Sequence, residues 1–192
     1  RAGKRGFILD VLPIEVEERL KDFVDGKYIL LSLMKLDIEF DGLDYSMPSA
    51  VNDIAFVSWG PSRTKVVRLS VEVDGQHLYY VEGDGIVVST PLGSSAYVLS
   101  AGGPLVDVEL DSITVAPIAP SQLFVRPVVL SPSRTVTVRV SRDSGPVACV
   151  VDGQEVALML PGTFANIRRS QTRFTLVRFK RFNTFSRLQE KE

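Results

Sequence analysis

The sequence predicts a mainly β protein, α+β overall, built as an antiparallel β-sandwich of many short strands. Short runs of β-branched and aromatic residues recur at regular spacing, separated by turn residues. Two Asp-Gly pairs, Asp74-Gly75 and Asp152-Gly153, each stand between two such runs, a strong signal for a tight β-hairpin. The expected strands are Tyr28–Phe40, Ile54–Trp59, Val66–Val73, His77–Glu82, Ile86–Val88, Ile113–Ala116, Val128–Leu130, Thr135–Val140, Val147–Val151, Glu155–Leu160, Phe164–Arg168 and Arg173–Phe179.

The two ends of the chain differ from this pattern. A short apolar run, Phe7–Val11, predicts a strand, and a helix follows it from Pro13 to Gly26. Proline suits the first turn of a helix, apolar residues then recur at helical spacing, and glycine ends it. The segment Phe182–Lys191 predicts a C-terminal helix.

Composition limits the class of protein. The chain has 192 residues, 45% of them hydrophobic, and a net charge of −1, so no overall field attracts nucleic acid or membranes. No apolar run is long enough to span a membrane, and no signal peptide is expected. The single cysteine, Cys149, favours a reducing, cytoplasmic compartment. The single histidine, His77, is expected to be a solvated strand residue, and no metal site is expected.

The stretch Gly83 to Pro104, GDGIVVSTPLGSSAYVLSAGGP, organises the chain. An acidic glycine turn, a short strand, a hydroxyl-rich loop, the start of a helix and a second glycine turn follow within it. Ser94 or Ser95 is expected near the N-cap of that helix. Such stretches are usually ordinary loops, but this one offers a carboxylate, hydroxyls, backbone donors and an aromatic ring that an adenosine nucleotide can use.

This stretch resembles the long second motif of NAD kinases, DG-x-x-x-STPTGSTAYxxSAGGP. The match covers Asp84-Gly85, Ser89-Thr90-Pro91, Gly93-Ser94, Ala96-Tyr97 and Ser100 to Pro104. It departs at Leu92, where the family has threonine or serine, and at Ser95, where it has threonine. The segment from Gly3 to Ile8 is similar to the end of the family's nucleotide domain. The resemblance therefore implies the end of an α/β nucleotide domain at 1–26, an NAD-binding sandwich at 27–180 and a helical tail at 181–192.

The resemblance also implies which residues bind NAD. Asn52 and Asp53 match an asparagine-glutamate pair that meets the adenosine half, although aspartate is one methylene shorter. Asp84 and Ala119 match positions near the nicotinamide end, in the first case often contributed by a neighbouring subunit. Tyr97 is either a ligand contact or a core aromatic. The further residues expected at the NAD site are Phe7, Ser95, Ala96 and Ser100.

For function, the resemblance implies the C-terminal part of an NAD kinase, which transfers a phosphate from ATP or polyphosphate to the adenosine 2′-hydroxyl of NAD and gives NADP. A divalent metal ion, usually magnesium, and a homo-oligomer, dimer or tetramer, are expected. The family's glycine-rich motif with the catalytic aspartate is not in this sequence, so no catalytic residue is expected here and the chain alone should be inactive. The alternatives are a non-catalytic NAD-binding or oligomerisation module and a related lipid kinase.

Overall fold

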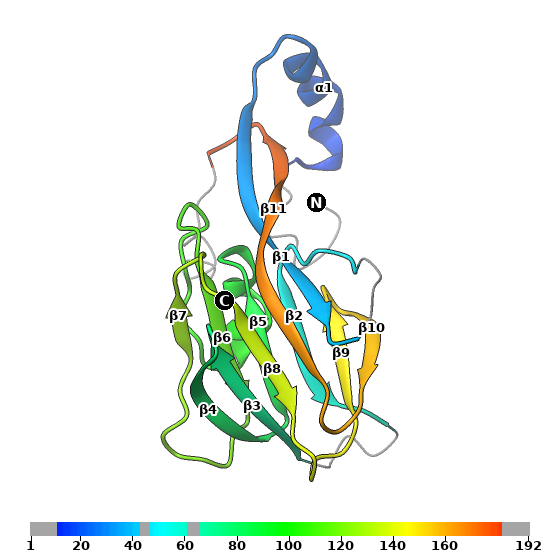
Figure 1. Cartoon of the computed structure of the whole chain (residues 1–192). Coiled ribbons are helices and arrows are strands. Elements are labelled where there is room, and N and C mark those ends of the chain that lie inside the picture. Colours follow the sequence, from blue (N-terminus) through cyan, green and yellow to red (C-terminus); the bar gives the residue numbers. More distant parts are fainter. Residues whose placement is uncertain (1–10, 43–46, 61–65, 182–192) are drawn as a thin grey trace. The chain divides into compact units, whose positions relative to one another are not determined.

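The computed structural model describes residues 11–42, 47–60 and 66–181 (Figure 1). Residues 7–10 of the first expected strand, Phe7 among them, and the whole expected helix Phe182–Lys191 fall outside these ranges. The chain divides into two compact units. One comprises residues 34–173, and the other comprises residues 1–33 together with residues 174–192.

The larger unit is an antiparallel β-sandwich, which confirms the predicted fold class. One sheet has the strand order β1-β11-β8-β3-β4 and the other the order β10-β9-β2-β5-β6-β7. The β3–β4 and β9–β10 pairs are the two predicted Asp-Gly hairpins. The strands are β1 (Ile29–Phe40), β2 (Asp53–Ser58), β3 (Val67–Val73), β4 (Gln76–Gly83), β5 (Gly85–Ser89), β6 (Ile113–Ile118), β7 (Val128–Leu130), β8 (Val136–Val140), β9 (Val147–Val151), β10 (Gln154–Met159) and β11 (Phe164–Arg178).

The main hydrophobic core lies between the two sheets. Alternate residues of the strands meet there, because successive side chains of a strand point to opposite faces. Phe56 and Ile86 come from one sheet, Leu69 and Val138 from the other, and all four are fully buried. Cys149 belongs to the same cluster, and burial raises the pKa of its thiol to about 12, so this cysteine is a core residue.

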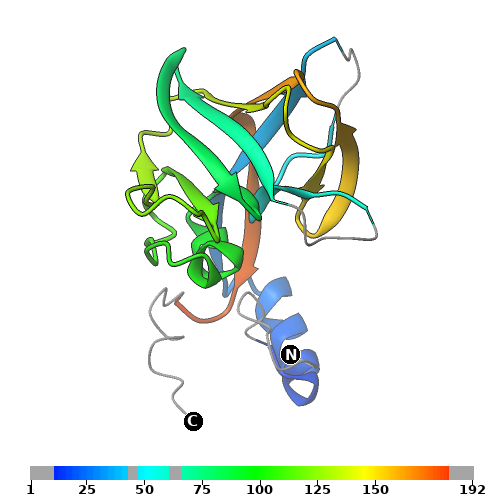
Figure 2. The same cartoon turned by 90° about the horizontal axis from the view of Figure 1, so that it is seen from below.

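Part of the outer face of the six-stranded sheet is also buried. Ala55, Val87 and Ala116 project there and pack with Val98 from the short helix α2 (Tyr97–Ser100). Strand β5 is consequently buried along its whole length. In Figure 2 helix α2 lies on the opposite side of this sheet from the β3–β4 hairpin. The outer face of the six-stranded sheet is therefore the place where the long motif packs on the sandwich.

One expected boundary is wrong. The sequence predicted two strands, Phe164–Arg168 and Arg173–Phe179, but the structure has one strand, β11, from Phe164 to Arg178. The intervening residues, Arg169 to Thr172, are polar but include neither glycine nor proline, so they do not break the strand. Arg173 and Arg169 instead pair with Asp111, at 2.7 and 3.6 Å.

The smaller unit contains the predicted N-terminal helix. A 3₁₀ turn, η1 (Pro13–Glu15), leads into α1 (Val16–Val24), and Gly26 follows with φ of 72°. Phe23 stacks on Tyr28 with ring centroids 5.2 Å apart. Within the described ranges, no helix has the length and apolar character needed to cross a membrane.

Candidate functional site

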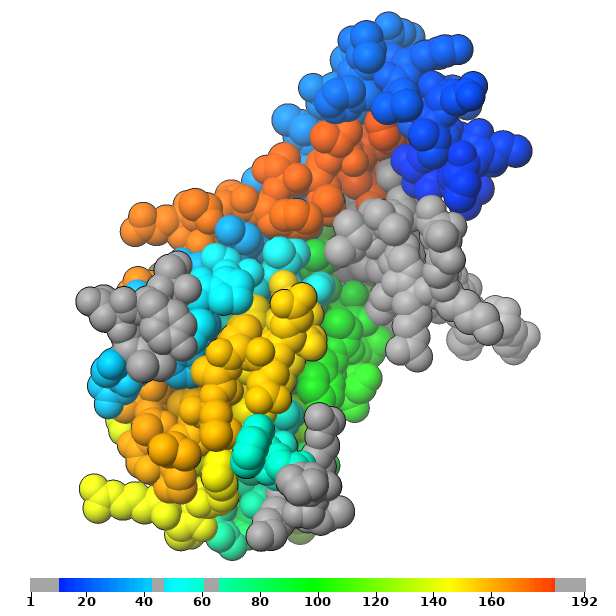
Figure 3. All heavy atoms as spheres, turned by 90° about the vertical axis from the view of Figure 1, so that its right-hand side faces the viewer, coloured from blue at the N-terminus to red at the C-terminus, as the bar shows by residue number. Residues whose placement is uncertain are grey.

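A pocket of about 560 Å³ opens on the outer face of the six-stranded sheet. Its apolar wall comes from alternate residues of β2 and β9, and Tyr97 of α2 lines it as well. Figure 3, seen from the β10 side, shows gold residues of the β9–β10 hairpin beside cyan and green residues from earlier in the chain. The lining residues are Asp53, Ala55, Val57, Ser58, Trp59, Gly60, Tyr97, Ala148, Val150, Gly153 and Glu155.

Asp53 is the buried acidic residue of the pocket. It begins β2, is only 7% exposed and lines the pocket. Burial, and secondarily the negative charge of Asp152, raise the pKa of its carboxyl group to about 6. A buried carboxylate needs hydrogen-bond donors, and a ligand with amino or hydroxyl groups can supply them.

The hydroxyl groups of Ser89 and Thr90 hold the segment that precedes β2. Thr90 Oγ1 donates to the carbonyl oxygen of Val51 at 2.7 Å. The Thr90 N–H donates to the carbonyl oxygen of Asn52 at 2.9 Å. The single hydrogen of Ser89 Oγ is shared between the carbonyl oxygens of Thr90, at 2.8 Å, and Asn52, at 3.1 Å. These two hydroxyls of the long motif therefore shape the site through the backbone of Val51 and Asn52.

Asp152 holds the same segment from its other side. This residue occupies the β9–β10 hairpin with φ of 47°, and its carboxylate accepts from the N–H groups of Val51, Asn52 and Asp53 at 2.8, 2.8 and 3.1 Å. Its own N–H donates to the carbonyl oxygen of Asp53 at 3.0 Å. Sequence reasoning identified Asp152 only as a turn residue, and the hairpin signal gave no hint of this long-range contact.

Glycine allows the long motif to approach this segment closely. A Cβ atom at Gly93 would lie 2.1 Å from the carbonyl oxygen of Asn52, and one at Gly85 would lie 2.1 Å from that of Phe56. Both contacts are with backbone atoms, which cannot move aside without disturbing β2. These two positions therefore require glycine for close packing.

The serine-rich loop leads into a helical turn, as predicted, but its serines bind the backbone of the loop. Leu92–Ser95 forms a 3₁₀ turn, η2, and the N-cap of α2 is Ala96. Ser95 directly precedes this N-cap, as expected, but no side chain makes a capping hydrogen bond there. Ser94 Oγ instead donates to the carbonyl oxygen of Pro91 at 2.6 Å and accepts from the Val106 N–H at 2.9 Å. The backbone carbonyl of Pro91 competes successfully for the hydroxyl because it lies three residues back in the same turn.

The other predicted residues of this loop lie at different depths. Tyr97 is 39% exposed and lines the pocket, so it is not a core aromatic. Ala96 and Ser100 are exposed on the same short segment. Ser95 is 5% exposed and its hydroxyl donates to the carbonyl oxygen of Leu92 at 3.1 Å.

Asp84 and Ala119 lie together at the other end of the sheet. Asp84 is an exposed residue between β4 and β5, and its N–H donates to the carbonyl oxygen of Ile118 at 2.9 Å. Ala119 is exposed with φ of 45°. Asp53 pairs with Ser89 and Val57 with Gly85, so four residue steps, roughly 14 Å, separate the two ends along β5.

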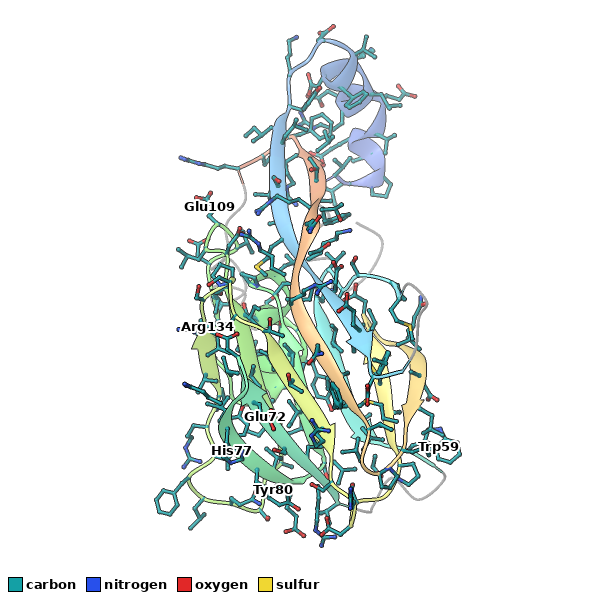
Figure 4. All side chains as sticks on the ribbon, viewed as in Figure 1. Trp59, Glu72, His77, Tyr80, Glu109 and Arg134 are labelled. Carbon is teal, nitrogen blue, oxygen red and sulfur yellow. The ribbon has the colours of Figure 1, made fainter. Side chains whose placement is uncertain are left out.

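Sequence reasoning missed several residues that line the pocket. Trp59 was noted only as the end of a strand, and Glu155 only as the start of one. Figure 4 shows Trp59 far from His77, which lies exposed on the β3–β4 hairpin as predicted. Among the residues that the structure describes, no group of three or more His, Cys, Asp or Glu side chains is placed to hold a metal ion.

Comparison with known proteins gives a consistent result. The family described as ATP-NAD kinase C-terminal domain matches residues 52–179. The NAD kinase of Aeropyrum pernix is 38% identical over 180 residues, which cover 94% of this chain and 62% of that protein. The NAD kinase of Thermococcus kodakarensis is 36% identical, over 93% of this chain and 63% of that protein. The chain thus spans somewhat more than three fifths of the length of these relatives.

Solved structures agree with the sequence comparison. Yeast NADH kinase complexed with NADH has a TM-score of 0.86 and 25% identity, with 98% of this chain and 55% of that chain covered. An NAD kinase from Archaeoglobus fulgidus in complex with ATP has a TM-score of 0.77 and 27% identity, with 95% of this chain and 68% of that chain covered. The chain belongs to the ATP-NAD kinase C-terminal domain family.

Proposed function

We propose that this chain is the NAD-binding part of an NAD kinase, and that its pocket takes the adenosine half of NAD. The observation that carries this proposal is the buried carboxylate of Asp53 in a pocket with an apolar wall and the ring of Tyr97. The flat adenine ring of adenosine can pack against the apolar wall and the ring of Tyr97. Its amino group and the ribose hydroxyl groups can donate hydrogen bonds to the Asp53 carboxylate. A volume of about 560 Å³ suits a ligand of this size.

Asp84 and Ala119 are proposed to meet the nicotinamide end of NAD. Asp84 lies five residue steps along β5 from Ser89, the partner of Asp53, which is roughly 17 Å. We propose that Asp84 and Ala119 serve the site of a neighbouring copy in a homo-oligomer, dimer or tetramer. Phe7, Asn52, Ser95, Ala96 and Ser100 remain proposed contacts. The proposed domain division is the end of a nucleotide domain at 1–26, the NAD-binding domain at 27–180 and a tail at 181–192.

The proposed reaction moves a phosphate from ATP or polyphosphate to the adenosine 2′-hydroxyl, giving NADP. One relative of known structure is described as an NADH kinase with NADH and another as an NAD kinase with ATP, which supports these substrate classes. In this scheme the chain binds and orients NAD, and the catalytic aspartate lies outside it. Such transfers depend mainly on positioning and electrostatics.

The described residues do not fit a resident magnesium site. Asp152 is close enough to Asp53 for its charge to raise the pKa of the Asp53 carboxyl group, but the oxygens of Asp152 already accept three backbone N–H groups. A divalent ion in this reaction would neutralise phosphate charge and is proposed to arrive with the phosphate donor. The buried thiol of Cys149 suits the reducing conditions of the cytoplasm, the proposed location. We propose no nucleic-acid or membrane partner.

The test uses the full-length protein and NAD titration by calorimetry, followed by assays of NADP formation with ATP and with polyphosphate. Saturable NAD binding with NADP formation is the expected result. NAD binding without NADP formation would instead favour the non-catalytic module, and phosphorylation of a lipid would favour the lipid kinase. The 192-residue chain alone is expected to form no NADP, and robust NADP formation by it would contradict the proposed division of roles.

A further inference from the structure

We propose that Asp152 is a positioning residue for the NAD site: its carboxylate fixes the backbone of residues 51–53 and thereby the place of the Asp53 side chain in the pocket. This inference rests on the proposed function, because it assigns Asp152 a part in binding the same ligand. The inference goes beyond the proposed function because it gives a role in NAD binding to a hairpin residue about one hundred positions away from Asn52 in the sequence.

The first argument is the convergence of three consecutive N–H groups on one carboxylate. Residues 51 and 52 form a bend before β2, where a backbone N–H has no regular sheet partner. Asp152 supplies the acceptor, with Oδ2 at 2.8 Å from the nitrogen of Val51 and Oδ1 at 2.8 and 3.1 Å from those of Asn52 and Asp53. Hydrogen bonds to an ionised acceptor are stronger than those between neutral groups, so this contact restrains the bend.

The second argument is that the carbonyl side of the same bend is held independently. Ser89 and Thr90 of the long motif bind the carbonyl oxygens of Val51 and Asn52. Asp152 holds the N–H side of the bend, so the bend is restrained from two elements. Loss of Asp152 leaves the carbonyl contacts intact but frees the N–H side, next to the pocket residue Asp53.

The third argument is electrostatic. The titratable groups that line the pocket with Asp53 are Tyr97 and Glu155, and Asp152 adds a carboxylate beside them. The negative charge of Asp152 contributes to the raised pKa of Asp53. Removal of that charge should therefore lower the pKa of Asp53. A substitution that only destabilised the β9–β10 hairpin would not be expected to cause this change.

The molecule provides a matched control in its other Asp-Gly hairpin. Asp74 has φ of 50°, close to the 47° of Asp152, and its carboxylate accepts from the Thr135 N–H at 2.9 Å and from Arg134 at 2.7 Å. The pocket lining includes none of these three residues. Asp74→Gly therefore repeats the local chemistry of Asp152→Gly in a hairpin away from the pocket.

The experiment compares Asp152→Gly and Asp152→Asn with Asp74→Gly and Asp74→Asn in the full-length protein. Glycine and asparagine both tolerate the left-handed backbone, so each turn survives the substitution. We expect Asp152→Gly to raise the KM for NAD about fivefold or more, with kcat and the KM for ATP changed less than about twofold. Asp74→Gly should leave all three within about twofold of the wild type.

Two further measurements on the same variants need no NAD. Amide exchange at residues 51–53 should accelerate about tenfold or more in Asp152→Gly and remain unchanged in Asp74→Gly. The carboxyl pKa of Asp53, followed by NMR, should fall in Asp152→Asn and stay near 6 in Asp74→Asn. Unchanged exchange and an unchanged pKa in the Asp152 variants would overturn the positioning role.

The outcomes separate the two proposals. A wild-type protein that does not bind NAD overturns the proposed function and, with it, the role of Asp152 in NAD binding. A wild-type protein that binds NAD, with Asp152→Gly binding as tightly as Asp74→Gly, overturns the inference alone. A rise in the KM for NAD confined to the Asp152 variants supports both.

Discussion

Asp53→Asn should stabilise the protein at neutral pH and weaken NAD binding. The folded protein raises the pKa of Asp53 from its ordinary 3.8 to about 6, mainly through burial. A raised carboxyl pKa means that the folded state favours the protonated form. The group therefore stabilises the fold fully below pH 3.8, and this contribution is lost as the pH rises through 6.

The magnitude follows from the two pKa values. At pH 7.5 the ionised, buried Asp53 lowers the free energy of unfolding by about 3 kcal/mol, and at pH 4.0 by about 0.6 kcal/mol. Asparagine has nearly the same shape and no charge, so Asp53→Asn should recover most of the larger amount at pH 7.5 and little at pH 4.0.

Urea denaturation of the full-length wild type and variant at both pH values measures this difference. Asp84→Asn is the matched control, because Asp84 is exposed at the other end of β5, and it should change the free energy of unfolding by less than about 0.5 kcal/mol at either pH. An increase in the free energy of unfolding that is equally large at pH 7.5 and pH 4.0 would refute the reasoning, because such an increase would not come from ionisation of Asp53. NAD titration of Asp53→Asn should show affinity about tenfold weaker, because a neutral amide accepts hydrogen bonds less strongly than a carboxylate.

Three further substitutions test other parts of the site. Gly93→Ala should lower the melting temperature and NAD affinity, because its Cβ would lie 2.1 Å from the carbonyl oxygen of Asn52, whereas Gly145→Ala, with open space around it, should be neutral in the same thermal scan. Leu92→Thr should lower the free energy of unfolding by about 1–3 kcal/mol in urea titration, because Leu92 is 3% exposed; an unchanged value would mean that its burial contributes little. Asp84→Ala should leave the unfolding curve unchanged but weaken NAD binding about tenfold in calorimetry, and equal affinity would reduce Asp84 to a turn residue.

The sandwich could be predicted from the sequence because its strands and hairpin turns each depend on a few neighbouring residues. Asp74-Gly75 and Asp152-Gly153 form the hairpins expected of them, since a two-residue turn depends on a few backbone angles. The break expected after Arg168 was wrong because polarity alone does not end a strand, and Arg169 and Arg173 pair with Asp111 across the structure. Contacts between distant residues leave no local signature, so the strand could not be read as continuous.

For the candidate site, the sequence located the residues but did not show what their hydroxyl groups bind. The long motif located the segment correctly, and Asp53 and Tyr97 do line one pocket. The hydroxyls of Ser89, Thr90 and Ser94, which looked like ligand groups, bind the backbone of the protein itself. A hydroxyl-rich sequence indicates only that hydrogen-bond donors and acceptors are present. The fold determines whether each hydroxyl binds a ligand or a neighbouring backbone carbonyl.

This use of hydroxyls explains why the pocket can hold a buried charge. Ionised Asp53 destabilises the fold at neutral pH, and a free backbone around it would relax to expose the carboxylate. The carbonyl contacts from Ser89 and Thr90 and the N–H contacts to Asp152 oppose that relaxation from two directions. The carboxylate is thereby held in the pocket in advance of the ligand, so that hydrogen-bond donors of NAD meet an acceptor already in place.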